Sequence, residues 1–183
     1  MAWAVGLAMI VAAWFVSGQT PEGADLASEP FSVSATVGEP AEGRNVGIEV
    51  HALALAERVE ADIWSAEGTW LVVDLDVWAI ESEPGATFNA AALQLGDRTF
   101  TASERGDSML GAFPLIDVAT RGRIAFELPA DAADARGTLR LGLNGTSDVD
   151  TLFLGDSVIE IPVDLAEVDR VETLTLDATE WVR

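Results

Sequence analysis

Two aspartates two positions apart are the residues of this sequence that could most readily do chemistry. Asp74 and Asp76 lie within residues 70–78 (WLVVDLDVW), whose side chains alternate between two faces in a pattern that predicts a β-strand. Residues i and i+2 of a strand share a face, so the two carboxylates are expected about 7 Å apart on its outer side. Such a pair could help to bind a hard cation such as Ca²⁺, or act as the two carboxyl groups of a glycosidase.

Neither site is complete in the sequence. A Ca²⁺ ion needs about four to six further oxygen ligands, and no Asp-x-Asp-x-Asp-Gly loop supplies them. A glycosidase needs a substrate cleft, which the sequence does not define, although Trp64 could line one. We favour a structural interpretation, in which Arg121 and Arg123 on a neighbouring strand pair with the two aspartates.

A second set of acids lies within the C-terminal third of the chain. Asp148, Asp150 and Asp156 could converge on a cation, but alternate acids in a solvated loop are common in a chain this acidic. His51 is the one imidazole of the sequence, and no Gly-x-Ser-x-Gly or His-Glu-x-x-His motif accompanies it. We therefore predict no catalytic residue, only weak metal candidates, and a protein that is not an enzyme.

The composition argues against several partners and cofactors. The chain has 31 acidic and 10 basic residues and a formal net charge of -21, which opposes binding to nucleic-acid phosphates and to anionic lipid headgroups. It has no cysteine, so disulfides, thiolate metal sites and cysteine nucleophiles are excluded. We predict no cofactor and no nucleic-acid partner.

Residues 1–18 are predicted to form a transmembrane anchor or a signal helix. Residues 2–16 contain no charged or polar side chain apart from two tryptophans, Trp3 and Trp14, near the two ends. A helix of this length spans roughly 24 Å, and local thinning of the bilayer could bring the hydrocarbon core of roughly 30 Å within its reach. Two alternatives stay open, namely a signal peptide cleaved after small residues such as Gly18, and a buried core helix.

One folded domain is expected behind this segment. Residues 19–30, rich in Gly, Pro, Ser and Glu, form a linker, residues 31–168 a β-sandwich, and residues 169–183 a C-terminal tail or a final strand. We expect a single-pass protein of the cell membrane with its domain outside, or a secreted protein if the N-terminal segment is cleaved.

After Pro30 the hydrophobic pattern has a period of two, which is typical of strands with one buried side. The alternation seen at residues 70–78 recurs at residues 123–128, 138–143 and 159–165. About seven to nine such strands, separated by turn residues, predict an all-β fold, an immunoglobulin-like antiparallel β-sandwich.

Local signals refine this prediction. The inward parity changes near His51 and Ala52, which predicts a β-bulge. Gly96 and Asp97 predict a tight hairpin turn. Pro162 cannot donate to a ladder, so its strand is expected at an edge, or with the proline facing an unpaired side. Further strands are expected at residues 31–37, 46–59, 91–95, 98–103 and 110–115.

The outward side of the strand at residues 70–78 is the predicted interaction face. Trp70, Val72, Asp74, Asp76 and Trp78 share this parity. Exposed tryptophan on such a face often marks a partner site. The alternative is that the N-terminal strand or the C-terminal tail covers the two tryptophans.

Three stretches resemble a known family. A Trp-led strand is followed by a hairpin with a glycine and an aromatic residue, and then by a Gly-x-x-x-Phe-x-x-Pro strand. This order is similar to the uncharacterised immunoglobulin-like domains of Gram-positive, actinobacterial surface lipoproteins and membrane proteins, which are themselves similar to a secreted mycobacterial immunoprotective antigen. The chain departs from the family where Ile116 and Asp117 replace a Pro-Gly turn and Ala79 a frequent Asn. The three stretches are residues 70–77, 95–100 and 121–129, within a resemblance over residues 46–163.

The resemblance implies an immunoglobulin-like fold and an extracytoplasmic setting, and leaves the function open. We expect a membrane-anchored module that binds an unidentified protein, or has a structural role, at the cell surface. Two alternatives stay open. One is a cation-dependent carbohydrate binder or small hydrolase using Asp74 and Asp76. The other is an accessory subunit of a membrane complex, whose apolar helix would pack against other helices through small residues such as Gly6.

Overall fold

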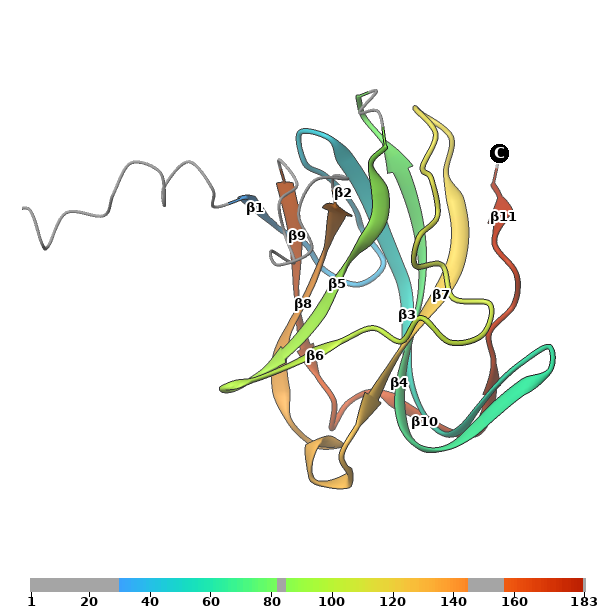
Figure 1. The fold of residues 1–183 in the computed structure, drawn as a ribbon. Coiled ribbons are helices and arrows are strands. Elements are labelled where there is room, and N and C mark those ends of the chain that lie inside the picture. Colours follow the sequence, from blue (N-terminus) through green and yellow to red (C-terminus); the bar gives the residue numbers. More distant parts are fainter. Residues whose placement is uncertain (1–29, 82–84, 145–156, 183) are drawn as a thin grey trace, which may run out of the picture.

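Two β-sheets stacked face to face make up the described part of the chain (Figure 1). This computed structural model describes residues 30–81, 85–144 and 157–182. The period-two alternation gives each strand one apolar side, and the apolar sides of the two sheets bury each other. Within these residues no helix is both long enough and apolar enough to cross a bilayer.

The first sheet has five strands in the order β1-β9-β8-β5-β6, and the second has six in the order β10-β3-β4-β7-β11, with β2 also paired to β3. The strands of the first sheet are β1 (Phe31–Ser34), β9 (Ser157–Asp164), β8 (Arg136–Asn144), β5 (Thr87–Leu95) and β6 (Arg98–Thr101). Those of the second sheet are β10 (Asp169–Thr175), β3 (Val46–Ala61), β4 (Trp64–Ala79), β7 (Thr120–Leu128), β11 (Glu180–Trp181) and β2 (Pro40–Glu42). A 3₁₀ turn, η1 (Ala130–Ala132), connects β7 to β8.

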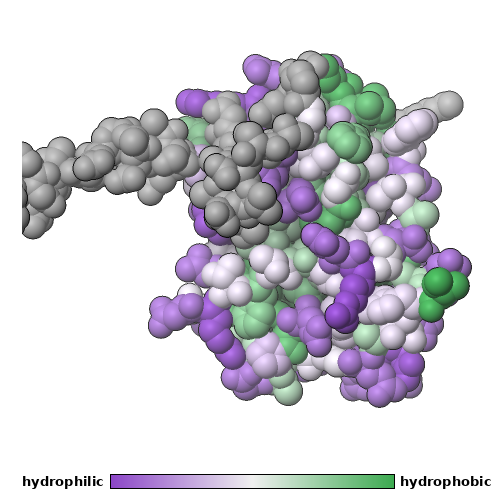
Figure 2. Space-filling model, viewed as in Figure 1, coloured by the Kyte–Doolittle hydropathy of each residue, from purple (hydrophilic) through white to green (hydrophobic). Residues whose placement is uncertain are grey.

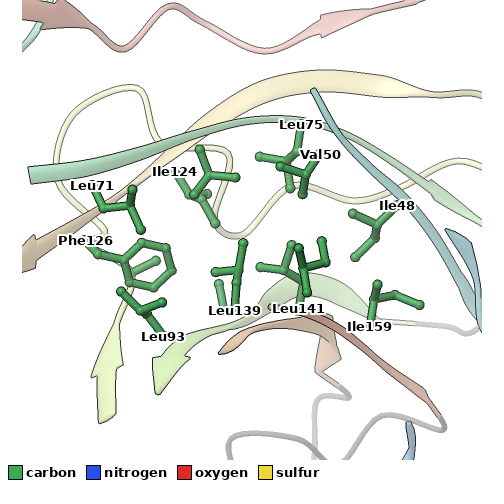
Figure 3. Close-up of a cluster of buried hydrophobic side chains, with 14 of the residues drawn as sticks. Ile48, Val50, Leu71, Leu75, Leu93, Ile124, Phe126, Leu139, Leu141 and Ile159 are labelled. Atoms are coloured by element: carbon green, nitrogen blue, oxygen red, sulfur yellow. The ribbon is translucent and has the colours of Figure 1, made fainter. Parts of the chain in front are cut away.

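The main core lies between the two sheets. Figure 3 shows labelled side chains of β4 and β7 pointing toward those of β5 and β8. Leu75 and Phe126 of the second sheet and Leu93 and Leu139 of the first are each 0% exposed. Removing such a side chain from water is worth about 1.5–3 kcal/mol. These residues lie at inward positions of strands that the sequence predicts. The alternation of side chains therefore predicts where the core lies.

The predicted all-β sandwich is confirmed, but two strands are not antiparallel to their partners. β1 pairs in parallel with β9, and β10 pairs in parallel with β3. The physical reason is that neither strand follows its partner through a hairpin turn, so no turn dictates its direction. The predicted N-terminal helix lies outside the described residues.

The strand predicted at residues 110–115 is wrong. This segment makes only isolated bridges, between Phe88 and Ala112 and between Leu115 and Val118. Gly111, with a φ of 83°, turns the chain away from an extended path. Pro114 has no N–H to donate to a ladder. The apolar residues that follow are therefore left in a loop.

Two local predictions are confirmed. The register of β3 against β4 shifts between Val50 and Ala52, which makes His51 the extra residue of a bulge. Leu95 pairs with Arg98, so Gly96 and Asp97 form a two-residue hairpin turn between β5 and β6.

Pro162 faces an unpaired side, as predicted. The backbone N–H of Ala35 donates to the carbonyl oxygen of Glu160 at 2.9 Å, so Glu160 presents its backbone groups to β1. Alternate residues of a strand present these groups to the same side. The nitrogen of Pro162 therefore points beyond Ser34, the last residue of β1 that pairs with β9, where no ladder bond is lost.

A turn stands where the resembled family has Pro-Gly. The N–H of Val118 donates to the carbonyl oxygen of Leu115 at 3.4 Å. Asp117 has a φ of 56°, the left-handed conformation that a type II turn requires at this position and that glycine usually supplies. Aspartate tolerates it better than most residues. The turn is thus present although the residue types differ.

We expect Phe126→Ala to lower the free energy of unfolding by about 3–5 kcal/mol, because it leaves a cavity between the sheets. Phe113→Ala, at a position that is 69% exposed, should change the free energy of unfolding by no more than about 0.5 kcal/mol. Urea unfolding of the two variants measures both values. Equal losses would mean that Phe126 is not in the core.

Candidate functional site

The outer face of the second sheet carries the two aspartates that the sequence pattern singles out. β4 lies between β3 and β7, so Asp74 stands opposite Arg123 and Asp76 opposite Arg121. Paired residues of adjacent strands share a face. The four charged side chains therefore lie together on the side of the sheet that is turned away from the main core.

Asp74 is held by two arginines. Nε of Arg121 donates to Oδ1 of Asp74 at 3.1 Å, and Nε of Arg123 lies 3.5 Å from Oδ2. Arg123 also donates to the carbonyl oxygen of Thr175 and to the carboxylate of Asp177, each at 2.6 Å. The predicted pairing of Asp74 with arginine is confirmed, and the second arginine links β7 to the C-terminal tail.

Asp76 pairs with a histidine instead of an arginine. It is 8% exposed, and Nε2 of His51 lies 3.0 Å from its Oδ2. Nδ1 of the same ring lies 3.4 Å from Oε1 of Glu49. The prediction that an arginine pairs with Asp76 is therefore wrong. The physical reason is the alternation along β3, because His51 shares the outward face with Glu49, two residues before it, and Glu49 stands opposite Asp76.

Three of the five residues of the predicted interaction face are buried, namely Asp76 and two apolar residues. Trp70 is 1% exposed and Val72 is 2% exposed. The curled end of the β3–β4 hairpin and the C-terminal tail cover them, which takes two apolar side chains out of water. The sequence left open whether the tail covers the two tryptophans, and in the structure the tail covers Trp70. The buried residues of this second core are Ala56, Val59, Ala61, Trp70, Val72, Ala125 and Leu176.

Trp78 is half-buried against the neighbouring strand. A Cβ atom on Gly47 would lie 2.0 Å from Cε2 of the Trp78 indole, so only glycine leaves room for the ring to lie flat on β3. Of the predicted interaction face, Asp74 and one side of Trp78 remain accessible.

A small hollow beside Asp74 has a volume of about 250 Å³. Its charged lining consists of two guanidinium groups and three carboxylates, so it has no large excess of either sign. Both oxygens of Asp74 already face an arginine, and a cation would have to displace these partners. The charged lining residues are Asp74, Arg121, Arg123, Asp177 and Glu180.

Asp74 and Asp76, the metal candidates within the described residues, are not joined by a third ligand. Across residues 30–81, 85–144 and 157–182, no three His, Asp or Glu side chains are grouped as metal ligands. Asp148, Asp150 and Asp156, the second set of weak candidates, lie outside the described residues.

Exposed apolar side chains gather at positions that the sequence analysis missed. Ile63, at the tip of the β3–β4 hairpin, is 97% exposed, and Phe113, in the loop before β7, is 69% exposed. Leu115, Ile116 and Val118 are exposed in the same loop. A signal was available for this loop, because residues 113–116 are an apolar run that contains a proline and does not alternate.

Comparison with known proteins adds no function. No protein-family model matches the chain, and no curated protein matches it. Among solved structures, it is similar to an uncharacterized beta-sandwich protein from Clostridium difficile 630, at 10% sequence identity and a TM-score of 0.47. The similarity covers 74% of this chain and 97% of that chain.

The second core makes the tail part of the domain. Leu176 is 1% exposed, so Leu176→Ala should lower the free energy of unfolding by about 2–5 kcal/mol. Val171, in the same tail, is 38% exposed, and Val171→Ala should lower the free energy of unfolding by distinctly less than Leu176→Ala does. Urea unfolding compares the two. A Leu176→Ala variant as stable as the parent chain would show that the tail does not cover Trp70.

Proposed function

We propose that this chain is a membrane-anchored extracytoplasmic β-sandwich module that acts by protein contact and has no catalytic activity. The anchoring is supported by the sequence of residues 2–16, an apolar run without a charged side chain. Such a run fits the hydrocarbon core of a bilayer. Among the described residues, the buried side chains of both cores come from residues 46–176.

The observation that carries the contact function is the exposure of Ile63. Its side chain is 97% exposed at the end of a protruding hairpin (Figure 1). The edge-to-face stacking of Trp64 on Trp70, with ring centroids 5.9 Å apart, braces the base of this tip. A large apolar side chain on a braced support can enter a partner's pocket with little loss of conformational freedom.

The tip lies at the far end of the sandwich from the point where the N-terminal segment joins it. Val46, at the start of β3, pairs with Ala79, at the end of β4, whereas Ala61 pairs with Trp64 beside the tip. A domain tethered at one end would present the opposite end to molecules outside the membrane.

The resemblance to immunoglobulin-like domains of Gram-positive surface proteins supports the same proposal. Its three stretches, residues 70–77, 95–100 and 121–129, fall on β4, on the β5–β6 hairpin and on β7. The accessory-subunit alternative shares the anchor and the contact function, and differs only in placing the partner within the membrane.

A carbohydrate-binding or hydrolytic function using Asp74 and Asp76 is less well supported. Asp74 is engaged by two arginines and Asp76 by His51. A platform of exposed tryptophans for a sugar would need Trp70 beside Trp64 and Trp78, and Trp70 is buried.

The anchor is tested by a charge placed inside the apolar segment. Ile10→Arg should release the full-length protein from membranes washed with alkaline carbonate, because arginine at the centre of a membrane helix costs about 2.5–3.5 kcal/mol. Ser17→Arg, outside the apolar run, is the matched control and should stay in the membrane pellet. Parent protein that washes off the membrane, or that is secreted without its first residues, would contradict the anchor.

Protein contact is tested by a photo-crosslinking amino acid placed at Ile63 in the membrane-bound chain. We expect one defined adduct, which an excess of parent protein prevents and an excess of Ile63→Asp protein does not. The control position is Asp97, the exposed tip of the other hairpin at this end. Identical adducts at both positions, or none at Ile63, would contradict a contact through this tip.

A further inference from the structure

We propose that the end of the sandwich formed by the loop before β7 rests on the lipid surface of the membrane, at an uncharged or zwitterionic region of the bilayer. The proposal rests on the membrane anchoring proposed above and adds a lipid-contacting site and an orientation of the domain. We call this surface the apolar end. It consists of Phe113, Leu115, Ile116 and Val118.

The apolar end is a concentrated patch. Nine large apolar side chains are exposed among the described residues, and four of the nine fall within residues 113–118. Phe113 is 69% exposed, Leu115 45% and Ile116 47%. Scattered exposed apolar residues are ordinary, but a contiguous group marks a contact with another apolar surface. Hydrophobic surface gathers at the top of the view in Figure 2, over the end of β4 and the loop before β7.

Backbone hydrogen bonds hold these side chains in place. The N–H of Ala79 donates to Leu115 O at 3.0 Å, and the N–H of Asp117 donates to Ala79 O at 3.1 Å. These two bonds fix the loop to the end of β4, on either side of Ile116. The apolar side chains are therefore presented by an ordered turn, and docking does not first have to order the chain.

The apolar end is the end at which the N-terminal part of the chain joins the sandwich. Phe31 pairs with Ser157, and the hydroxyl of Ser157 accepts a hydrogen bond from Arg44 N at 2.6 Å. The N–H of Ile80 donates in turn to Asn45 O at 3.1 Å, one residue beyond the point where Ala79 binds the loop. A continuous set of contacts thus connects the start of β1 with the apolar end.

The linker is short enough to keep this end at the bilayer. Residues 19–30 span at most about 40 Å when fully extended, and much less as a flexible coil. A patch tethered at such a distance has a high effective concentration at the membrane surface. Contacts too weak to recruit a free protein are then sufficient to orient a tethered one.

Charge decides which lipid surface fits. The chain carries a net charge of -21, and Asp117 lies between Ile116 and Val118 of the apolar end. Anionic headgroups would repel this surface. The apolar side chains and the absence of Lys or Arg within residues 113–118 match the boundary between acyl chains and zwitterionic headgroups instead.

The test uses the full-length chain in phosphatidylcholine nanodiscs. The chain has no cysteine, so an environment-sensitive fluorophore can be attached at a single site in Phe113→Cys or in Ile63→Cys. Both positions are highly exposed, and both labelled variants should unfold at the urea concentration of the parent chain. We expect a blue shift at position 113, and a loss of emission when the acyl chains carry a nitroxide quencher. Position 63, at the far end, should show neither.

Three results would overturn the docking proposal. The first is a label at position 113 that stays water-exposed and unquenched in a chain that floats with the nanodisc, because the anchor then stands and the docking fails. The second is a blue shift without nitroxide quenching that grows with protein concentration, which would assign the apolar end to a second copy of this chain. The third is equal quenching in anionic and phosphatidylcholine discs, which would overturn the part of the proposal that assigns the apolar end to an uncharged or zwitterionic surface. A chain that does not float would instead contradict the anchor on which the proposal rests.

Discussion

The structure depends on the burial of β4 on both of its sides. This strand pairs with β3 along its length and with β7 from Thr69 to Val77, so its backbone groups are used in two ladders. Its inward side chains fill the main core, and Trp70 and Val72 on its outward side fill a second, smaller core beneath the hairpin and the tail. Hydrophobic stabilisation scales with the apolar area removed from water. Packing of the tail over the large indole of Trp70 therefore stabilises the folded position of the tail.

Much of this architecture follows from the sequence, since side-chain alternation is a local property of strands. Leu71 and Leu75 lie opposite in parity to the outward residues of the strand at residues 70–78 and are buried, and the bulge at His51 is visible in the sequence as a change of parity. The segments that cover the outer face of β4 could not be predicted from the sequence. Alternation indicates which residues share a face and does not indicate which segment packs on that face. Of the partners of Asp74 and Asp76, only those of Asp74 agree with the prediction. The arginine partners of Asp74 follow from pairing with β7, whereas Asp76 pairs with His51 of β3, the strand on its other side.

The same limit explains why the predicted interaction face on β4 is largely buried. Outward tryptophans indicated a contact face on β4, and the structure uses one of them, Trp70, to hold the tail. The apolar side chains that stay exposed lie instead at the two ends of the sandwich, on the hairpin tip and on the loop before β7. In the proposed arrangement, the end at the tether faces the lipid and the other end faces a partner.

The central claim is that the C-terminal tail covers Trp70 while the ends of the sandwich stay open. Hydroxyl-radical footprinting tests it directly, because Trp70 and Trp181 have the same intrinsic reactivity and differ in exposure, at 1% and 75%. The account predicts rapid oxidation of Trp181 and of the loop at Phe113, with Trp70 oxidised only on unfolding. Oxidation of Trp70 in the native protein at a rate close to that of Trp181 would contradict it.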